Sequence, residues 1–235
     1  MKRCTVLPSP PNAKEIVADL RSRARPENLA GMARYGMTPA GRLGVSVPEM
    51  RHLARRIGTN HALALRLWAT GIQEARMVAS MIADPQRMTA REMDAWVRDL
   101  DSWDVCDQAC MNLFERSPKA WTRALAWTGR KGEFVRRAGF VLLARLAQTD
   151  RTASDQQFLD VLPVAVQGAA DGRNYVKKAV SWTLRQIGKR NARLRAAVLS
   201  TARELSMHKA PSARWIASDV AQDLSRSGVR SGKRP

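Results

Sequence analysis

The sequence predicts an all-α protein, a superhelical solenoid of HEAT-like or armadillo-like repeats with about six helix pairs. Apolar residues recur with helical spacing almost throughout the chain, and alternating runs of β-branched residues are nearly absent. A segment also repeats after 41 residues, since 134–138 (FVRRA) aligns with 175–179 (YVKKA). A period near forty with two helices in each unit is typical of these repeat architectures.

The repeat predicts where basic side chains gather. Stacked units place equivalent residues on successive inner helices, so the repeated basic pair would form a stripe of positive charge. Such a stripe fits a phosphate backbone. A second and weaker similarity relates 75–80 (ARMVAS) to 213–218 (ARWIAS).

Caps and breakers divide the chain into about a dozen helices of ten to eighteen residues. Helices are expected to begin at Pro48 and, with Ser117 as N-cap, at Pro118. The capping box predicts two further starts, at Thr89–Glu92 and Ser154–Gln157, and Gly71 and Gly129 are expected to end helices. These helices would form a single repeat domain over 13–224, between a flexible proline-containing arm (1–12) and a flexible basic tail (225–235).

Charge indicates the class of partner. The 235 residues contain 40 Lys and Arg against 21 Asp and Glu, a net charge of +19. Such a balance favours a polyanion, most simply nucleic acid. Arginine-rich usage from codon bias is the alternative explanation, because 31 of the 40 basic residues are Arg.

The position of the charges along the chain sharpens this expectation. Residues 172–203 contain nine basic residues and no acid, although a solvated outer face would account for part of them. Residues 91–107 show the reverse balance, with six acids and two Arg. A basic chain with one acidic segment is more informative than a uniformly basic one, because a carboxylate on a DNA-binding face costs affinity unless it has a function.

Several function classes are disfavoured. No apolar run approaches the roughly 18 residues of a membrane span, and the N-terminus has no apolar core of a secretory signal. Cys106 and Cys110 are expected to be buried thiols in a reducing cytoplasm, and the three histidines show no metal-binding spacing. No metal, no cofactor and no membrane partner are therefore expected, and the protein is placed in the cytoplasm, on the nucleoid when bound to DNA.

The acidic segment contains the strongest candidate for chemistry. Ser102 is a plausible N-cap, so Trp103 and Asp107 would lie four residues apart on one face of the next helix. Trp182 and Arg185 share a face in the basic repeat. By contrast, Trp96, Trp121 and Trp127 fall at apolar-periodic positions and are expected in the core.

Five segments of this chain resemble the AlkD-like DNA alkylation repair glycosylases, a family of HEAT-like α-solenoids. The resemblance extends from about Met32 to Asp223, and its specificity comes from the order and spacing of short motifs. These motifs are 32–35 (MARY), 44–49 (GVSVPE), 103–107 (WDVCD), 135–138 (VRRA) and 178–185 (KAVSWTLR).

The resemblance implies a role for each matching residue. Asp107 would be the catalytic carboxylate, Trp103 and Trp182 the cleft tryptophans around the lesion, and Tyr35 a further cleft residue. Arg137 would hold a phosphate near the lesion, and the basic residues Lys178 and Arg185 would contact DNA. The chain departs from the family pattern in the segment Gly36–Leu43 and at Val47 before Pro48. Both places lie in the N-terminal region, so they concern the range of lesions and the binding of DNA there rather than the catalytic step.

The expected function is therefore that of a monomeric DNA glycosylase in base excision repair. It would hydrolyse the N-glycosidic bond of N3-methyladenine and N7-methylguanine in double-stranded DNA. The same charge and helices would also serve a HEAT-repeat protein that binds damaged or branched nucleic acid without cleaving it, or a solenoid that scaffolds protein partners.

Overall fold

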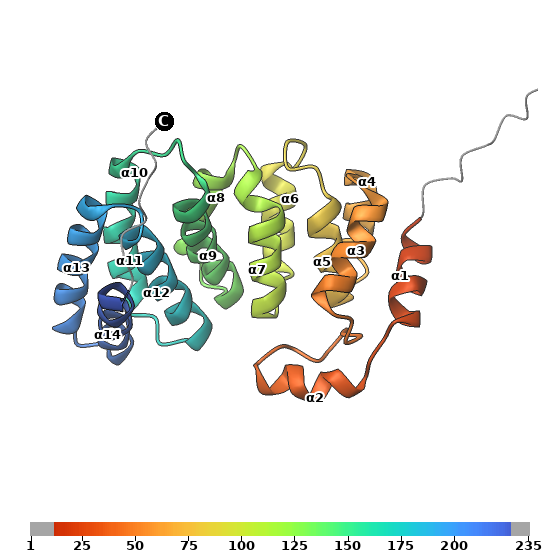
Figure 1. Ribbon diagram of the computed structural model, residues 1–235, viewed down its shortest axis with the longest axis horizontal. Coiled ribbons are helices and arrows are strands. Elements are labelled where there is room, and N and C mark those ends of the chain that lie inside the picture. Colours follow the sequence, from red (N-terminus) through yellow and green to blue (C-terminus); the bar gives the residue numbers. More distant parts are fainter. Residues whose placement is uncertain (1–11, 227–235) are drawn as a thin grey trace, which may run out of the picture. The chain divides into compact units, whose positions relative to one another are not determined.

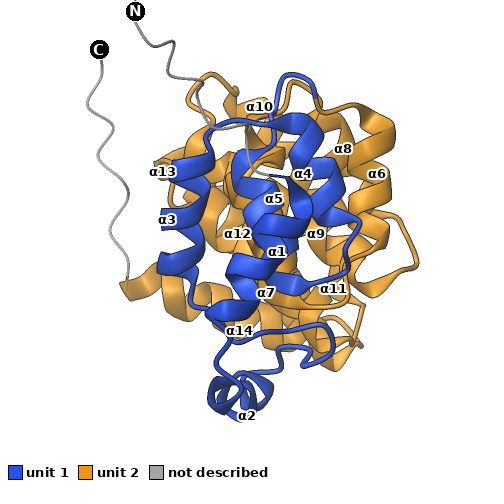
Figure 2. Ribbon diagram, turned by 90° about the vertical axis from the view of Figure 1, so that its right-hand side faces the viewer, with its two compact units in different colours: residues 1–87 blue, residues 88–235 orange. Residues whose placement is uncertain are grey.

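The computed structural model describes residues 12–226, and this part of the chain is entirely helical. It contains fourteen α-helices and one short 3-10 helix, with no strand among the described residues. Its contacts group the chain into two compact units, residues 1–87 and 88–235 (Figure 2). Within 12–226, no helix combines the length and the apolarity needed to cross a membrane.

Unit 1 is built on the packing of α3, α4 and α5, with α1 against α4 and α5. None of the eight residues of α2 is buried. The chain between α2 and α3 is held by Glu74, a buried side chain of α5 that accepts the backbone N–H groups of Leu43 (2.9 Å) and Gly44 (2.8 Å). The helices of this unit are α1 (Ala13–Ser22), α2 (Glu27–Arg34), α3 (Val47–Ile57), α4 (His61–Trp68) and α5 (Gln73–Ile82).

Unit 2 is organised around two long helices, α9 and α12, which pack against each other. Helix α9 also packs on α7 and α8, and α12 on α11, α13 and α14, so that α7, α9, α12 and α14 form a continuous row within this unit (Figure 1). Its helices are α6 (Ala90–Arg98), α7 (Trp103–Asn112), η1 (Phe114–Arg116), α8 (Ala120–Thr128), α9 (Glu133–Thr149), α10 (Asp155–Leu159), α11 (Val161–Ala169), α12 (Asn174–Gly188), α13 (Ala192–Ser206) and α14 (Pro211–Arg226).

The close contact of α8 with α9 depends on Gly139. A Cβ at this position would lie 2.6 Å from the backbone nitrogen of Thr128 and 2.8 Å from the carbonyl oxygen of Ala124. Neither backbone atom can move away without displacing α8, so any larger residue would push the two helices apart. This packing positions the first turns of α9, which carry Arg137.

The core of unit 2 confirms two of the three tryptophans expected there. Trp96 and Trp127 are buried, and their rings lie 6.5 Å and 5.4 Å from the ring of Phe114. Trp121 is only partly buried, because its indole N–H donates to Asp150 (2.8 Å) at the surface while its ring meets Phe158.

The predicted fold class is confirmed, and so are most of the predicted helix starts. Pro48 lies in the first turn of α3, and the capping boxes at Thr89 and Ser154 are both formed. The prediction at Ser117 was wrong. Helix α8 begins at Ala120, and the Ser117 hydroxyl instead accepts the N–H of Lys119 (3.3 Å).

The repeated segments occupy equivalent places. FVRRA lies in the first turns of α9 and YVKKA in the first turns of α12. The predicted arm lies outside the described residues except for Asn12, which caps α1. The predicted tail lies outside them from residue 227 onward, and α14 continues to Arg226, two residues past the expected boundary.

Candidate active site

The candidate site centres on an ion pair between Asp107 of α7 and Arg137 of α9. The guanidinium holds the carboxylate with Nη2 at 2.8 Å from Oδ1 and 2.9 Å from Oδ2, and with Nε at 3.2 Å from Oδ1. Its remaining nitrogen, Nη1, donates to the carbonyl oxygen of Tyr175 in α12 (2.9 Å). One side chain therefore connects three successive helices of the row and fixes the orientation of the carboxylate.

Burial sets the electrostatics of this pair. The side chains of Asp107 and Arg137 are 15% and 7% exposed. Burial raises the pKa of Asp107 to about 6, although the positive charge and hydrogen bonds of Arg137 act in the opposite direction. Burial also works against the charge of Arg137, but the attraction of Asp107 raises the Arg137 pKa above its usual value. At neutral pH both groups are charged.

Trp103 shares the face of α7 that carries Asp107. It is the first residue of the helix, is partly exposed, and precedes Asp107 by one turn. Ser102 occupies the N-cap position as predicted, but it does not cap the helix through its side chain. Its hydroxyl instead donates to the buried carboxylate of Asp104.

Helix α12 presents the remaining predicted residues of this unit along one face. Lys178, Trp182 and Arg185 follow one another at spacings of four and three residues, which places them on one side of the helix. Lys178 is exposed and Trp182 partly exposed. Arg185 lies against two carboxylates of α14, Asp219 (3.5 Å) and Asp223 (3.6 Å).

Tyr35 belongs to the other unit. It follows the last residue of α2 and is 78% exposed, so its ring is available for contact with a ligand. Six of the seven predicted site residues thus lie in unit 2, on α7, α9 and α12.

The phosphate contact expected of Arg137 does not match its surroundings. Arg137 is only 6% exposed, and its donors are directed at Asp107 and at the Tyr175 carbonyl. Asp107 and Arg137 lie 30 residues apart in the chain, and their contact was not predicted from the sequence. The repeat offered a signal that was not used. Helices about one repeat apart pack together, so a partner for Asp107 of α7 would be expected on α9.

Part of the predicted basic charge is neutralised within unit 2, and further basic side chains are held by carbonyl groups. Between residues 172 and 203, most basic side chains bond to acids or carbonyl groups of neighbouring helices. The bonded residues are Arg173 with Asp171, Arg185 with Asp219 and Asp223, Lys189 with Asp223, Arg190 with the carbonyls of Ala147 and Asp150, Arg193 with Asp155, and Arg195 with the carbonyl of Leu224. Lys178 and Arg203 are exposed.

The acidic segment also contains structural carboxylates. Asp94 accepts the indole N–H of Trp127 (2.7 Å) and pairs with Arg123 (3.1 Å), while Glu92 closes the capping box of α6. Asp107 differs from Asp94 because its side chain is less exposed, 15% against 30%, and because it follows a partly exposed tryptophan by one helical turn.

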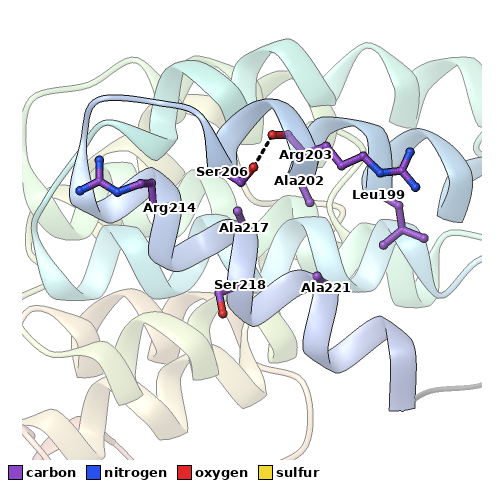
Figure 3. A pocket seen from close by; sticks show the side chains of 8 residues that line it. All are labelled: Leu199, Ala202, Arg203, Ser206, Arg214, Ala217, Ser218 and Ala221. Atoms are coloured by element: carbon purple, nitrogen blue, oxygen red, sulfur yellow. Dashed lines mark hydrogen bonds between the residues drawn. The ribbon is translucent and has the colours of Figure 1, made fainter.

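A groove of about 490 Å³ lies elsewhere, between α13 and α14 (Figure 3). Leu199 and small residues line its floor, and Arg203 and Arg214 border it. It shares no residue with the candidate site. Among the described residues, no group of three or more His, Cys, Asp or Glu is placed to hold a metal ion.

Comparison with known proteins identifies the family. The sequence profile described as DNA alkylation repair enzyme matches residues 16–219, most of the chain. The chain belongs to the DNA alkylation repair enzyme family. Its predicted resemblance to the HEAT-like repeat glycosylases is thereby confirmed, and this membership supports a role in DNA repair.

A solved structure shows the same fold. It is described as "a new family of proteins related to the HEAT-like repeat DNA glycosylases with affinity for branched DNA structures". It superposes with a TM-score of 0.75 at 20% identity, covering 90% of this chain and 95% of that one. The comparison with curated protein sequences found no match. The HEAT-like repeat fold of this member of the DNA alkylation repair family is thus established, while its particular activity depends on the site.

Proposed function

We propose that the protein is a DNA glycosylase of base excision repair that removes cationic alkylated purines, N3-methyladenine and N7-methylguanine, from duplex DNA. The observation that carries the proposal is the Asp107 carboxylate, 15% exposed, held in one orientation by Arg137 and one helical turn from Trp103. Family membership supports DNA as the ligand.

The chemistry suits a carboxylate without a general acid. An N3- or N7-alkylated purine carries a formal positive charge, so the base leaves as a neutral molecule when the electron pair of the N-glycosidic bond moves onto it. Positive charge then develops on the sugar, and a fixed anion stabilises this transition state. Water adds to C1′ and loses a proton, which completes the hydrolysis. No metal or cofactor takes part in this proposal.

Arg137 is a positioning residue in this scheme. Its two-pronged contact prevents the carboxylate from rotating, and its charge keeps Asp107 ionised in a buried site. The cost of burying the pair is met by nearly complete hydrogen bonding of the guanidinium, including the Tyr175 carbonyl.

The aromatic residues would surround the lesion. The faces of Trp103 and Trp182 attract a cationic nucleotide through their π electrons. Tyr35, in the other unit, is proposed as a further aromatic contact to DNA. Lys178 is exposed and suited to a phosphate contact. Arg185 is already held by two carboxylates, so its proposed DNA contact would be weaker than that of Lys178.

The second candidate function is binding of branched DNA without cleavage. It is favoured by the solved structure of similar fold, which is described as having affinity for branched DNA. The two proposals differ in one outcome, since only a glycosylase leaves an abasic site behind. For either function we propose that the protein acts as a cytoplasmic monomer on nucleoid DNA.

The direct test is incubation of excess protein with a duplex containing one N7-methylguanine. We expect free N7-methylguanine and an alkali-labile abasic site to appear together, at a rate well above that of the same duplex without protein. Binding of this duplex or of a four-way junction without base release would instead favour the non-cleaving protein.

Base release is expected to depend on pH through Asp107. Because the pKa of this carboxyl is about 6, ionisation is nearly complete at about pH 7.5 and falls to about one tenth at about pH 5. The single-turnover rate should fall about tenfold over this range. Stability should change in the opposite sense, since a raised carboxyl pKa stabilises the folded state at low pH and this contribution is lost as pH rises through about 6.

A rate that is flat between these two pH values would contradict an ionised Asp107 as the group responsible. The uncatalysed loss of N7-methylguanine, measured in the same buffers, is the control for the chemistry of the base itself.

A further inference from the structure

The contact between α12 and α14 is a ladder of side chains, which we call the α12–α14 seam. Helix α12 contributes residues at four-residue intervals, and α14 opposes them at the same interval. The seam comprises Lys177, Ser181 and Arg185 on α12, Lys189 at the C-cap of α12, and Trp215, Asp219 and Asp223 on α14.

Three of the four steps of the seam place an acid opposite the α12 side chain. The Ser181 hydroxyl donates to Asp219. Arg185 lies between Asp219 and Asp223, and the Lys189 ammonium is 2.7 Å from Asp223. The cations in this part of the seam are therefore neutralised by carboxylates and have little net attraction for a phosphate.

The remaining step differs because an aromatic ring replaces the acid. The ammonium of Lys177 lies 4.5 Å from the centroid of the Trp215 ring, and Trp215 is 39% exposed. A cation–π contact at an exposed site contributes about 0.5–1 kcal/mol and orients the lysine. The ring carries no net charge, so the positive charge of Lys177 is not neutralised.

Neighbouring residues add to this positive end of the seam. Lys178 follows Lys177 and is exposed, and Arg214 precedes Trp215 and is exposed. Arg214 donates to the carbonyls of His208 and Lys209, contacts that hold the guanidinium without cancelling its charge. Cations and an exposed indole thus gather at the first turns of α12 and α14, whereas carboxylates occupy the far end.

We propose that Lys177 and Trp215 form a second DNA contact, distinct from the Asp107 site, in which Lys177 binds a backbone phosphate and the Trp215 ring packs against the adjoining sugar. Charge complementarity identifies the ligand, because a phosphodiester adds the anion that this step of the seam lacks. The inference rests on the proposed function in taking DNA as the ligand. It also limits the DNA footprint, since Lys189, which is paired with Asp223, contributes no phosphate contact.

The test is equilibrium binding of an undamaged DNA duplex, followed by fluorescence anisotropy as the salt concentration is varied. We expect Lys177→Gln to weaken binding about fivefold at about 100 mM salt and to reduce the slope of log K against log salt by about 0.9, the value for one lost phosphate contact. Trp215→Ala should also weaken binding, and Trp215→Phe should retain most of the affinity because the ring is kept.

Lys189→Gln is the matched control, because it removes the same charge from the same helix at a step where Asp223 already neutralises the lysine. It should change affinity less than twofold and leave the slope unaltered. An unchanged slope for Lys177→Gln, or equal losses for both lysine variants, would overturn the proposal. Thermal unfolding of each variant confirms that both remain folded.

This experiment separates the proposal from the glycosylase activity. Undamaged DNA needs no base release, so a protein that fails to excise N7-methylguanine but shows the Lys177 effect contradicts only the proposed function. Excision together with an unchanged Lys177→Gln slope contradicts only the second contact. A wild-type protein that binds no duplex overturns both.

Discussion

Asp107→Asn is expected to lower the single-turnover release of N7-methylguanine from duplex DNA by at least about 10²-fold, the usual loss when one preorganised electrostatic group is removed. The amide has nearly the same shape as the carboxylate but lacks the negative charge that would stabilise the sugar. The rate of base release under excess protein, compared with the wild type at about pH 7.5, measures the effect.

Asp104→Asn is the matched control for this variant. Asp104 lies one turn before Asp107 on the same helix, is buried, and accepts a hydrogen bond from Ser102. An asparagine at 104 can still accept this hydrogen bond through its amide oxygen. The negative charge of Asp104 raises the pKa of Asp107, so removing that charge should leave the rate near neutral pH almost unchanged. Equal losses in the two variants would mean that general charge in this segment, rather than the Asp107 carboxylate, is responsible.

Arg137→Met is expected to lower the free energy of unfolding by about 3–5 kcal/mol, because it leaves Asp107 as a buried charge without its partner. The Tyr175 carbonyl also loses a hydrogen bond from this side chain. Denaturant titration measures the loss, and excision should fall as well, since the carboxylate would both rotate freely and take up a proton at higher pH.

Arg137→Met and Asp107→Asn can be combined in a double-mutant cycle. If the two groups stabilise each other as their geometry indicates, the double variant Arg137→Met/Asp107→Asn should be more stable than the sum of the two single losses predicts. Arg137→Lys keeps the positive charge but not the two-pronged contact, so it should retain more stability than Arg137→Met while still losing excision rate. A stable Arg137→Met protein with wild-type excision would contradict the role given to this ion pair.

The helical repeat was predictable because short sequence patterns indicate it. The capping boxes at Thr89 and Ser154 depend on residues three positions apart, and the alignment of FVRRA with YVKKA compares two short contiguous segments. All of them appear in the structure where expected. Ser117 misled because a serine before a proline is also a common way to end a short helix, as it does here after η1.

Contacts between helices could not be predicted in the same way, because they join residues about one repeat apart. Asp107 meets Arg137 after 30 residues and Ser181 meets Asp219 after 38. Counting charges along the chain identified a basic segment, but its neutralisation by α14 depends on which faces of the two helices pack together. The distinction between Lys177 and Lys189, and between Asp107 and Asp94, is therefore visible only in three dimensions.

We propose that the Asp107 carboxylate serves chemistry rather than DNA binding, and one paired measurement on Asp107→Asn tests this role. On the same N7-methylguanine duplex, both the dissociation constant and the single-turnover rate of base release are determined. We expect binding equal to or tighter than that of the wild type, because a negative charge has been removed from the proposed DNA site, together with the loss of excision. Wild-type excision by Asp107→Asn, or loss of binding in proportion to loss of excision, would contradict it.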